Sequence, residues 1–261
     1  MESPAFPISQ IHPFGLEARV VAGLGLCEVP AGIVRDWVAE HRLVVLRGIR
    51  SPSDDEMMQF CSRLGTILEW EFGAVNELKA KPDPKNYLYT NRAVPFHWDG
   101  AFAGKVPHYI FFHCEGASPA GSGGETLFCD TTKLLQRISA DQLRQWKEIR
   151  ITYSTEKVVH YGGRFTSPLL ERHPASGQPI IRFAEPVEDL NPVQLEIHGL
   201  LPEQHEGFLG EMAQLLREPE TCLVHAWRTG DIVIADNHAL LHGRNAFTQT
   251  AERHLRRVNI L

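Results

Sequence analysis

Cysteine is scarce in this sequence, and no apolar stretch is long enough to cross a membrane. The 261 residues include five cysteines, an odd number, and no pair has the Cys-x-x-Cys spacing of a structural zinc site. These facts exclude a disulfide framework and a zinc knuckle, and they favour a reducing compartment. A transmembrane helix needs about 20 apolar residues, whereas runs such as 43–46 and 109–112 are far shorter. We therefore expect no membrane partner.

Positive charge is also in deficit. Lysine and arginine number 26 against 32 aspartates and glutamates, which gives a formal net charge of -6. Such a balance argues against a general nucleic-acid-binding surface. The first five residues lack the basic start and apolar core of a signal peptide, so a cytoplasmic location is expected. The sequence leaves open whether the protein is a monomer or a homo-oligomer.

The composition is that of one globular domain over residues 1–261, with 43% hydrophobic and 22% charged residues. Helical spacing predicts helices over 31–41 and 53–64, a pair after Asp130, and one over 203–216. Strand-like runs occupy 43–46, 86–90, 109–114, 126–129, 149–153, 179–183, 222–227, 231–235 and 255–261. Because strands and helices do not alternate, we predict a mainly β fold with flanking helices and a jelly-roll core.

The strongest local signal for chemistry is the segment Pro95–Gly100. On an extended chain, His97 and Asp99 point to the same face. Two histidines and one carboxylate around a metal mark non-haem Fe(II) oxygenases, so the second histidine must come from elsewhere. The pair His113 and Glu115 has the same spacing, but it follows an apolar run, and we expect His113 to be a core histidine.

The C-terminal region supplies further candidates. Arg253 and Arg257 lie 11 and 15 residues after His242, and on a strand they share a face about 13 Å apart. Arginine suits the bidentate capture of a carboxylate, and this offset is too large for both to hold the same one. Arg256 points to the opposite face, where solvent is expected.

Taken together, these motifs resemble the TauD/TfdA family of Fe(II)/2-oxoglutarate oxygenases over essentially the whole chain. The resemblance implies a double-stranded β-helix, the jelly-roll form already predicted. It implies that His97, Asp99 and His242 bind Fe(II), and that O2 is consumed. It also implies that Arg253 and Thr126 bind 2-oxoglutarate and that Arg257 holds an acid group of the substrate. Relatives that halogenate lack the carboxylate, so Asp99 favours hydroxylation or desaturation.

A closer resemblance is to the PvcB/IsnB branch of this family, carried by 70–75, 95–100, 233–237, 241–244 and 253–258. It implies oxidation of a small-molecule amino-acid isocyanide, chiefly that of tyrosine, in bacterial secondary metabolism. The product would be a conjugated alkene, with or without loss of the carboxylate. Tyr89 and Phe102 are candidates for an aryl pocket. Two alternatives stay open: a hydroxylase of another sulfonate or aryl acid, and a metal-binding β-barrel without turnover.

Overall fold

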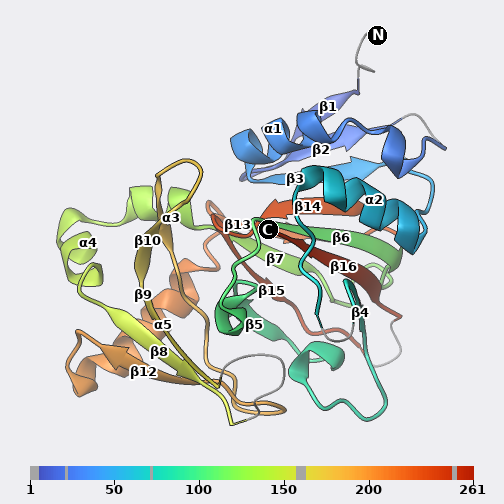
Figure 1. Ribbon diagram of the computed structural model, residues 1–261. Coiled ribbons are helices and arrows are strands. Elements are labelled where there is room, and N and C mark those ends of the chain that lie inside the picture. Colours follow the sequence, from blue (N-terminus) through green and yellow to red (C-terminus); the bar gives the residue numbers. More distant parts are fainter. Residues whose placement is uncertain (1–5, 21–22, 71–72, 157–162, 249–251) are drawn as a thin grey trace.

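The computed structural model describes residues 6–20, 23–70, 73–156, 163–248 and 252–261 (Figure 1). Glu71 and Phe72, part of one motif used above, lie outside the described residues. In the part of the chain that is described, no helix has the length and apolar character needed to cross a membrane.

Two sheets face each other and form the jelly-roll core; neither closes into a barrel (Figure 1). The larger has seven strands in the order β1 (Ile8–Gln10), β2 (Leu16–Arg19), β3 (Leu43–Arg47), β14 (Ile232–Asp236), β6 (Tyr109–Gly116), β16 (His254–Ile260) and β4 (Val75–Lys79). The smaller has the order β13 (Cys222–His225), β7 (Thr126–Asp130), β15 (Leu240–Arg244) and β5 (Val94–His97). Side chains such as Val45, Phe112, Phe128, Leu240 and Leu255 fill the space between them. The predicted mainly β, jelly-roll fold is confirmed.

Helices α1 (Ala31–His41) and α2 (Asp54–Leu64) cover the outer face of the larger sheet. At the start of α2, the Ser53 side chain accepts from the Glu56 backbone N–H, and the Glu56 carboxylate accepts from the Ser53 N–H. This capping box satisfies backbone donors that would otherwise have no partner. Because α1 and α2 cover one face of β3 and the smaller sheet covers the other, all of Leu43–Leu46 is buried.

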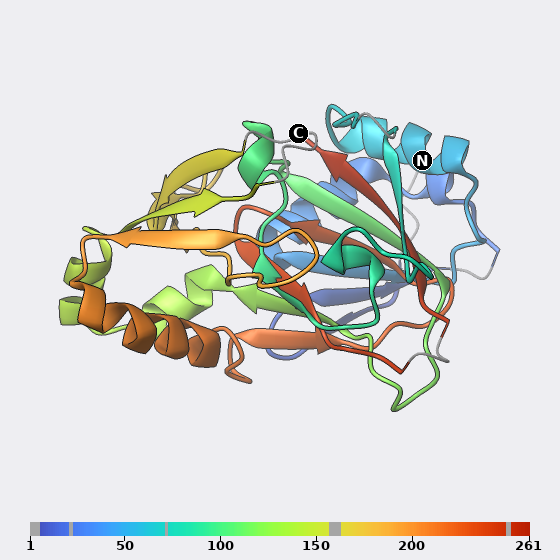
Figure 2. The same cartoon turned by 90° about the horizontal axis from the view of Figure 1, so that it is seen from below.

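Residues between β7 and β13 build a second layer on the outer face of the smaller sheet. It contains α3 (Thr131–Arg137), α4 (Ala140–Trp146), β8 (Arg150–Ser154), β9 (Arg164–Pro168), β10 (Leu170–Arg172), β11 (Pro179–Ile181), β12 (Gln194–His198) and α5 (His205–Leu215). Trp146, Phe183 and Met212 pack there against Phe96 and Leu241 of the smaller sheet. Figure 2 shows α5 on the opposite side of the molecule from α2. Both faces of β5 and β15 are therefore covered, which fixes the strands that carry the site.

Two local predictions are wrong. Residues 86–90, expected as a strand, contain the short 3-10 helix η2 (Tyr87–Tyr89), because the Asn86 side chain caps it by accepting from the Leu88 N–H at 2.9 Å. Arg256, expected in solvent, is buried under the start of α2, where it donates to Asp54 at 2.7 Å. Its neighbour across the sheet is His113, which is buried as predicted and accepts from Arg256 at 2.9 Å.

Candidate metal centre and active site

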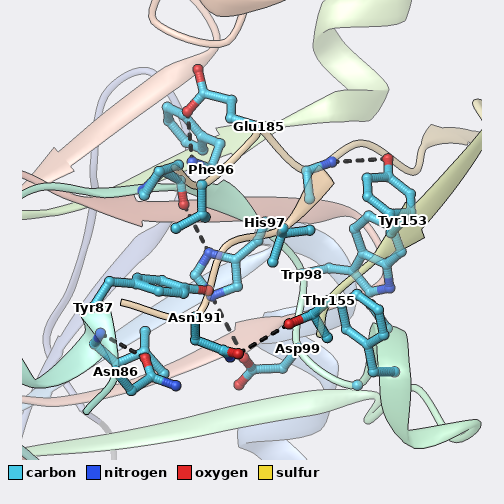
Figure 3. A pocket seen from close by; sticks show the side chains of 18 of the residues that line it. Asn86, Tyr87, Phe96, His97, Trp98, Asp99, Tyr153, Thr155, Glu185 and Asn191 are labelled. Carbon is cyan, nitrogen blue, oxygen red and sulfur yellow. Dashed lines mark hydrogen bonds and ion pairs between the residues drawn. The ribbon is translucent and has the colours of Figure 1, made fainter. Parts of the chain in front are cut away.

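The structure brings His97, Asp99 and His242 together at one point. Strands β5 and β15 are antiparallel, and their register sets His97 directly opposite His242, with 4.3 Å between ring centroids. Asp99 follows β5 by two residues, and its Oδ1 lies 3.8 Å from the Nε2 of each histidine. Figure 3 shows the His97 ring and the Asp99 carboxylate turned toward each other. Three ligand atoms therefore converge from two strands of the smaller sheet.

The protonation states suit a divalent metal ion. The His97 Nδ1 lies 2.8 Å from the Pro95 carbonyl oxygen; a carbonyl only accepts, so Nδ1 carries the proton and Nε2 offers a lone pair. Burial lowers the pKa of His97, and burial together with His97 lowers the pKa of His242 to about 3. Burial alone would raise the pKa of Asp99, but Arg257, then His242 and His97, lower it to about 2. Two neutral imidazoles and a carboxylate are the forms that bind metal.

Asp99 is held through its backbone and its side chain. The Asn237 side chain accepts from the Asp99 N–H at 2.9 Å and donates to its carbonyl at 3.0 Å. On the carboxylate, Asn259 Nδ2 donates to Oδ2 at 2.8 Å, and Arg257 Nη1 lies 3.0 Å from Oδ1 and 2.9 Å from Oδ2. Gly100 follows with φ +91°, and a Cβ there would lie 2.4 Å from the Lys105 carbonyl oxygen. Glycine is thus required directly after Asp99.

A cavity on one side of the triad contains a buried cation without an acidic partner. Arg253 Nε donates to the Gly124 carbonyl at 2.7 Å, and Nη2 donates to Thr126 Oγ1 at 3.2 Å. Trp227 Nε1 also donates to this hydroxyl, at 2.9 Å. Among the residues described, no carboxylate lies within 4 Å of the Arg253 guanidinium. Burial, with neighbouring Arg244, lowers the pKa of Arg253 to about 9, so the cavity is suited to an anion.

A second, larger cavity is lined by His97 and Asp99 (Figure 3). It encloses about 940 Å³, its open mouth included, and aromatic rings from Trp98, Phe102 and Tyr153 line much of it. The remaining wall is partly polar and includes Asn86, Thr155, Glu185 and Asn191. Arg257 lines both cavities, and so its guanidinium lies at their junction with the metal site.

The comparisons with known proteins agree with this geometry. The family model described as "Taurine catabolism dioxygenase TauD, TfdA family" matches residues 9–259. The chain belongs to this family.

Among the relatives, the 3-((Z)-2-isocyanoethenyl)-1H-indole synthase of Fischerella ambigua is 45% identical, over 100% of this chain and 97% of its own. A tyrosine isonitrile desaturase of Pseudomonas aeruginosa is 37% identical, over 91% and 84% of the two chains. The solved structure of PvcB from Pseudomonas aeruginosa matches with a TM-score of 0.84 at 33% identity, over 100% and 93%. PvcB is described as an Fe, alpha-ketoglutarate dependent oxygenase from an isonitrile synthetic pathway.

As a member of the TauD family, this chain is an Fe(II)/2-oxoglutarate-dependent dioxygenase that uses O2. The structure fits this cofactor set because neutral His97 and His242 and ionised Asp99 leave the other positions of a metal ion open. The cavity around Arg253 and Thr126 adjoins the triad and suits a dicarboxylate.

Not every residue expected in this TauD-family site lies in it. Tyr89 is not among the residues that line the larger cavity; its hydroxyl donates to Asn76 Oδ1 at 3.2 Å. Tyr87 lines the cavity instead, as does Phe102, which was expected there. Sequence reasoning also missed Asn259, although it shares the strand parity of Arg253 and Arg257. The even spacing of Asn259 from Arg257 was therefore the sequence signal that could have identified it.

Arg244 ties the wall of the cavities to the strand of His242. Its guanidinium donates to the backbone carbonyls of Leu88 at 3.0 Å and of Thr90 and Arg92 at 2.7 Å each. Leu88 lines both cavities. Arg244 lies two residues after His242 on β15. Its hydrogen bonds therefore hold the segment 88–92 against the strand that carries this metal-binding histidine.

A second cluster, of His108, His173 and Asp236, has ligand atoms close enough for a metal ion. Hydrogen bonds already account for two of its members, His173 and Asp236. His173 Nδ1 accepts from the backbone N–H groups of Ala175 and Ser176, so its Nε2 carries the proton and donates to Asp236 Oδ2 at 2.9 Å. This histidine is a donor in a structural network.

Proposed function

We propose that this enzyme oxidises the isonitrile of an aromatic amino acid at its side-chain β carbon, giving a conjugated alkene with or without loss of the carboxylate. The observation that carries the proposal is the junction at Arg257, where an aromatic-lined cavity meets His97 and Asp99. Relatives that match nearly their full length are named for the same kind of product, an isocyanoethenyl indole, or for desaturation of tyrosine isonitrile. The two names differ in the aryl group, an indole in one and the phenol of tyrosine in the other.

In this proposal His97, Asp99 and His242 hold iron, while Arg253 and Thr126 hold the distal carboxylate of 2-oxoglutarate. With O2, the bound iron and 2-oxoglutarate supply an oxidant that removes hydrogen from a C–H bond, while 2-oxoglutarate becomes succinate and CO2. The residues of the chain bind the substrate and orient it toward the metal site.

That positioning follows from the cavity. The Arg257 guanidinium binds the substrate carboxylate, and the rings of Trp98, Phe102 and Tyr153 pack against the aryl group. Anchoring a substrate at both ends fixes its β carbon beside the metal site and restricts it to productive orientations. Burial of Arg257 strengthens its attraction for a carboxylate, because water is largely excluded there.

The test is product analysis with protein loaded anaerobically with Fe(II) and then given 2-oxoglutarate, O2 and tyrosine isonitrile. We expect succinate together with a product lighter by two hydrogens, or by CO2 and two hydrogens, in mass spectrometry. The tryptophan-derived isonitrile is assayed in parallel because of the indole-forming relative. Succinate formed only with a sulfonate or another aryl acid would support the hydroxylase alternative. If none of these acids gives succinate, the remaining alternative is a metal-binding β-barrel without turnover.

We also propose that residues 1–261 act as one catalytic domain in the cytoplasm. The match of the family model to residues 9–259 supports the first statement. All five cysteines are free thiols, four of them buried, which supports a reducing compartment.

A further inference from the structure

The side chain of Asn259 contacts the metal-binding carboxylate, but burying one of its polar atoms is energetically unfavourable. Asn259 lies on β16, is 1% exposed, and donates from Nδ2 to Asp99 Oδ2 at 2.8 Å. Its own side-chain oxygen is buried and has no hydrogen-bond partner among the residues that the structure describes. A buried acceptor without a donor is unfavourable, and a leucine of similar volume would avoid that cost. The hydrogen bond to the Asp99 carboxylate offsets that cost, so the reason for an amide at this position lies in its contact with Asp99.

The two oxygens of Asp99 have different surroundings, and Asn259 makes the difference. Oδ1 faces the metal site, 3.8 Å from the Nε2 atoms of both His97 and His242. Oδ2 receives the Asn259 amide. Arg257 Nη1 lies at nearly equal distances from both oxygens, 3.0 and 2.9 Å, so it neutralises the carboxylate without selecting one of them.

We propose that Asn259 is a positioning residue that reserves Asp99 Oδ1 for the metal ion and keeps Oδ2 out of its coordination sphere. The inference rests on the proposed role of Asp99 as a metal ligand. A carboxylate that bound through both oxygens would take one of the three positions that two histidines and one carboxylate oxygen leave open. 2-Oxoglutarate, a chelator, needs two of them. Asn259 thus protects a position for cosubstrate or O2.

The decisive variant is Asn259→Leu, studied without turnover. Anaerobic titration with Co(II), followed by visible absorption, gives the metal affinity, and titration of the Co(II)-loaded protein gives the 2-oxoglutarate affinity. Loss of a partner that orients a metal ligand weakens metal binding by roughly 10- to 100-fold, and we expect about tenfold because Arg257 remains. We expect 2-oxoglutarate to bind at least severalfold more weakly, although Arg253 and Thr126 are unchanged. The melting temperature of the metal-free variant should stay close to that of the wild type, because leucine removes the unpaired oxygen together with the hydrogen bond to Asp99.

Asn76→Leu is the matched control. Asn76 is 5% exposed and lies on β4 directly opposite Arg257, but its side-chain oxygen accepts from the Tyr89 hydroxyl, and among the residues described it makes no hydrogen bond to Asp99. We expect this variant to melt at a lower temperature and to bind Co(II) and 2-oxoglutarate as the wild type does. Asn259→Ser is a second variant for the case that leucine does not fold, because the shorter hydroxyl does not reach Oδ2.

The outcomes separate this inference from the proposed function. If Asn259→Leu, or Asn259→Ser in its place, leaves either affinity unchanged, the positioning role is overturned. If Asp99→Ala binds Co(II) like the wild type, the metal assignment itself fails, and the proposed function fails with it. Loss of Co(II) binding in Asp99→Ala, together with weakening of both affinities in the Asn259 variants, supports both.

Discussion

Replacing Arg253 by alanine should weaken 2-oxoglutarate binding by a factor that the structure allows us to bound. Burial and Arg244 lower the pKa of Arg253 from 12.5 to about 9, which corresponds to roughly 5 kcal/mol of unfavourable charging. Truncating one partner of a desolvated charge pair costs about 2–5 kcal/mol. The dissociation constant of 2-oxoglutarate should therefore rise by roughly 30-fold to several thousandfold.

The assay is anaerobic titration of 2-oxoglutarate into the Co(II)-loaded protein. Co(II) affinity itself should stay within about twofold of the wild type, because Arg253 donates to Gly124 and Thr126 and not to the metal ligands. Arg228→Ala, which removes an exposed arginine from another cavity that Arg253 also lines, controls for the loss of one positive charge. Unchanged 2-oxoglutarate binding in Arg253→Ala would refute the assignment of this residue as the anchor. An equal loss in Arg228→Ala would show that only long-range charge matters.

Three further results are expected. His97→Ala, Asp99→Ala and His242→Ala should each weaken Fe(II) binding and stop succinate formation, since each removes a converging ligand atom; near-normal product from Asp99→Ala would contradict this. Arg257→Leu should weaken binding of the substrate acid and also of the metal, because Arg257 contacts Asp99. With the metal site saturated with Co(II) in both proteins, binding of a decarboxylated substrate analogue should not change in Arg257→Leu, and equal losses for acid and analogue would leave Arg257 only a packing role. Arg256→Leu should destabilise the protein by about 1–3 kcal/mol, because the buried Pro52 carbonyl and His113 lose a hydrogen-bond donor while Asp54, 60% exposed, is solvated by water; an unchanged midpoint in urea would mean that these contacts contribute nothing.

The side-chain parity of a strand was predictable, but what covers each face was not. Arg253 and Arg257 share the inner face of the larger sheet, and the irregular pairing near His254 places the extra residue, Glu115, on β6 and not on β16. Parity also assigned Arg256 correctly to the outer face. It could not show that α2 covers that face, because the helix packs there from nearly 200 residues earlier in the chain.

The error at Tyr89 has a similar local cause. On the strand expected at 86–90, Tyr87 and Tyr89 would share a face. A 3-10 helix has about three residues per turn, so residues two apart point in different directions, and only Tyr87 reaches the cavity. The cap formed by Asn86, which decides between the two conformations, is a single hydrogen bond.

The metal site was predictable only in part from the residues themselves. His97 and Asp99 are close in sequence, so an extended segment was enough to pair them. His242 was assigned by family resemblance, since its strand β15 was not anticipated and its register against β5 is a long-range property. Applying the same side-chain alternation to position 259 would also have placed Asn259 in the site.

The way Arg244 is bonded bears on how the substrate range of such an enzyme can change during evolution. Toward residues 88–92 its guanidinium donates to backbone carbonyl oxygens, and every amino acid has a carbonyl oxygen. A substitution at Leu88, which lines both cavities, can therefore change the shape and polarity of the cavity wall while the chain keeps its path and the histidine strand stays in place. Selection for a new aryl group can act on this side chain without first disturbing the iron chemistry.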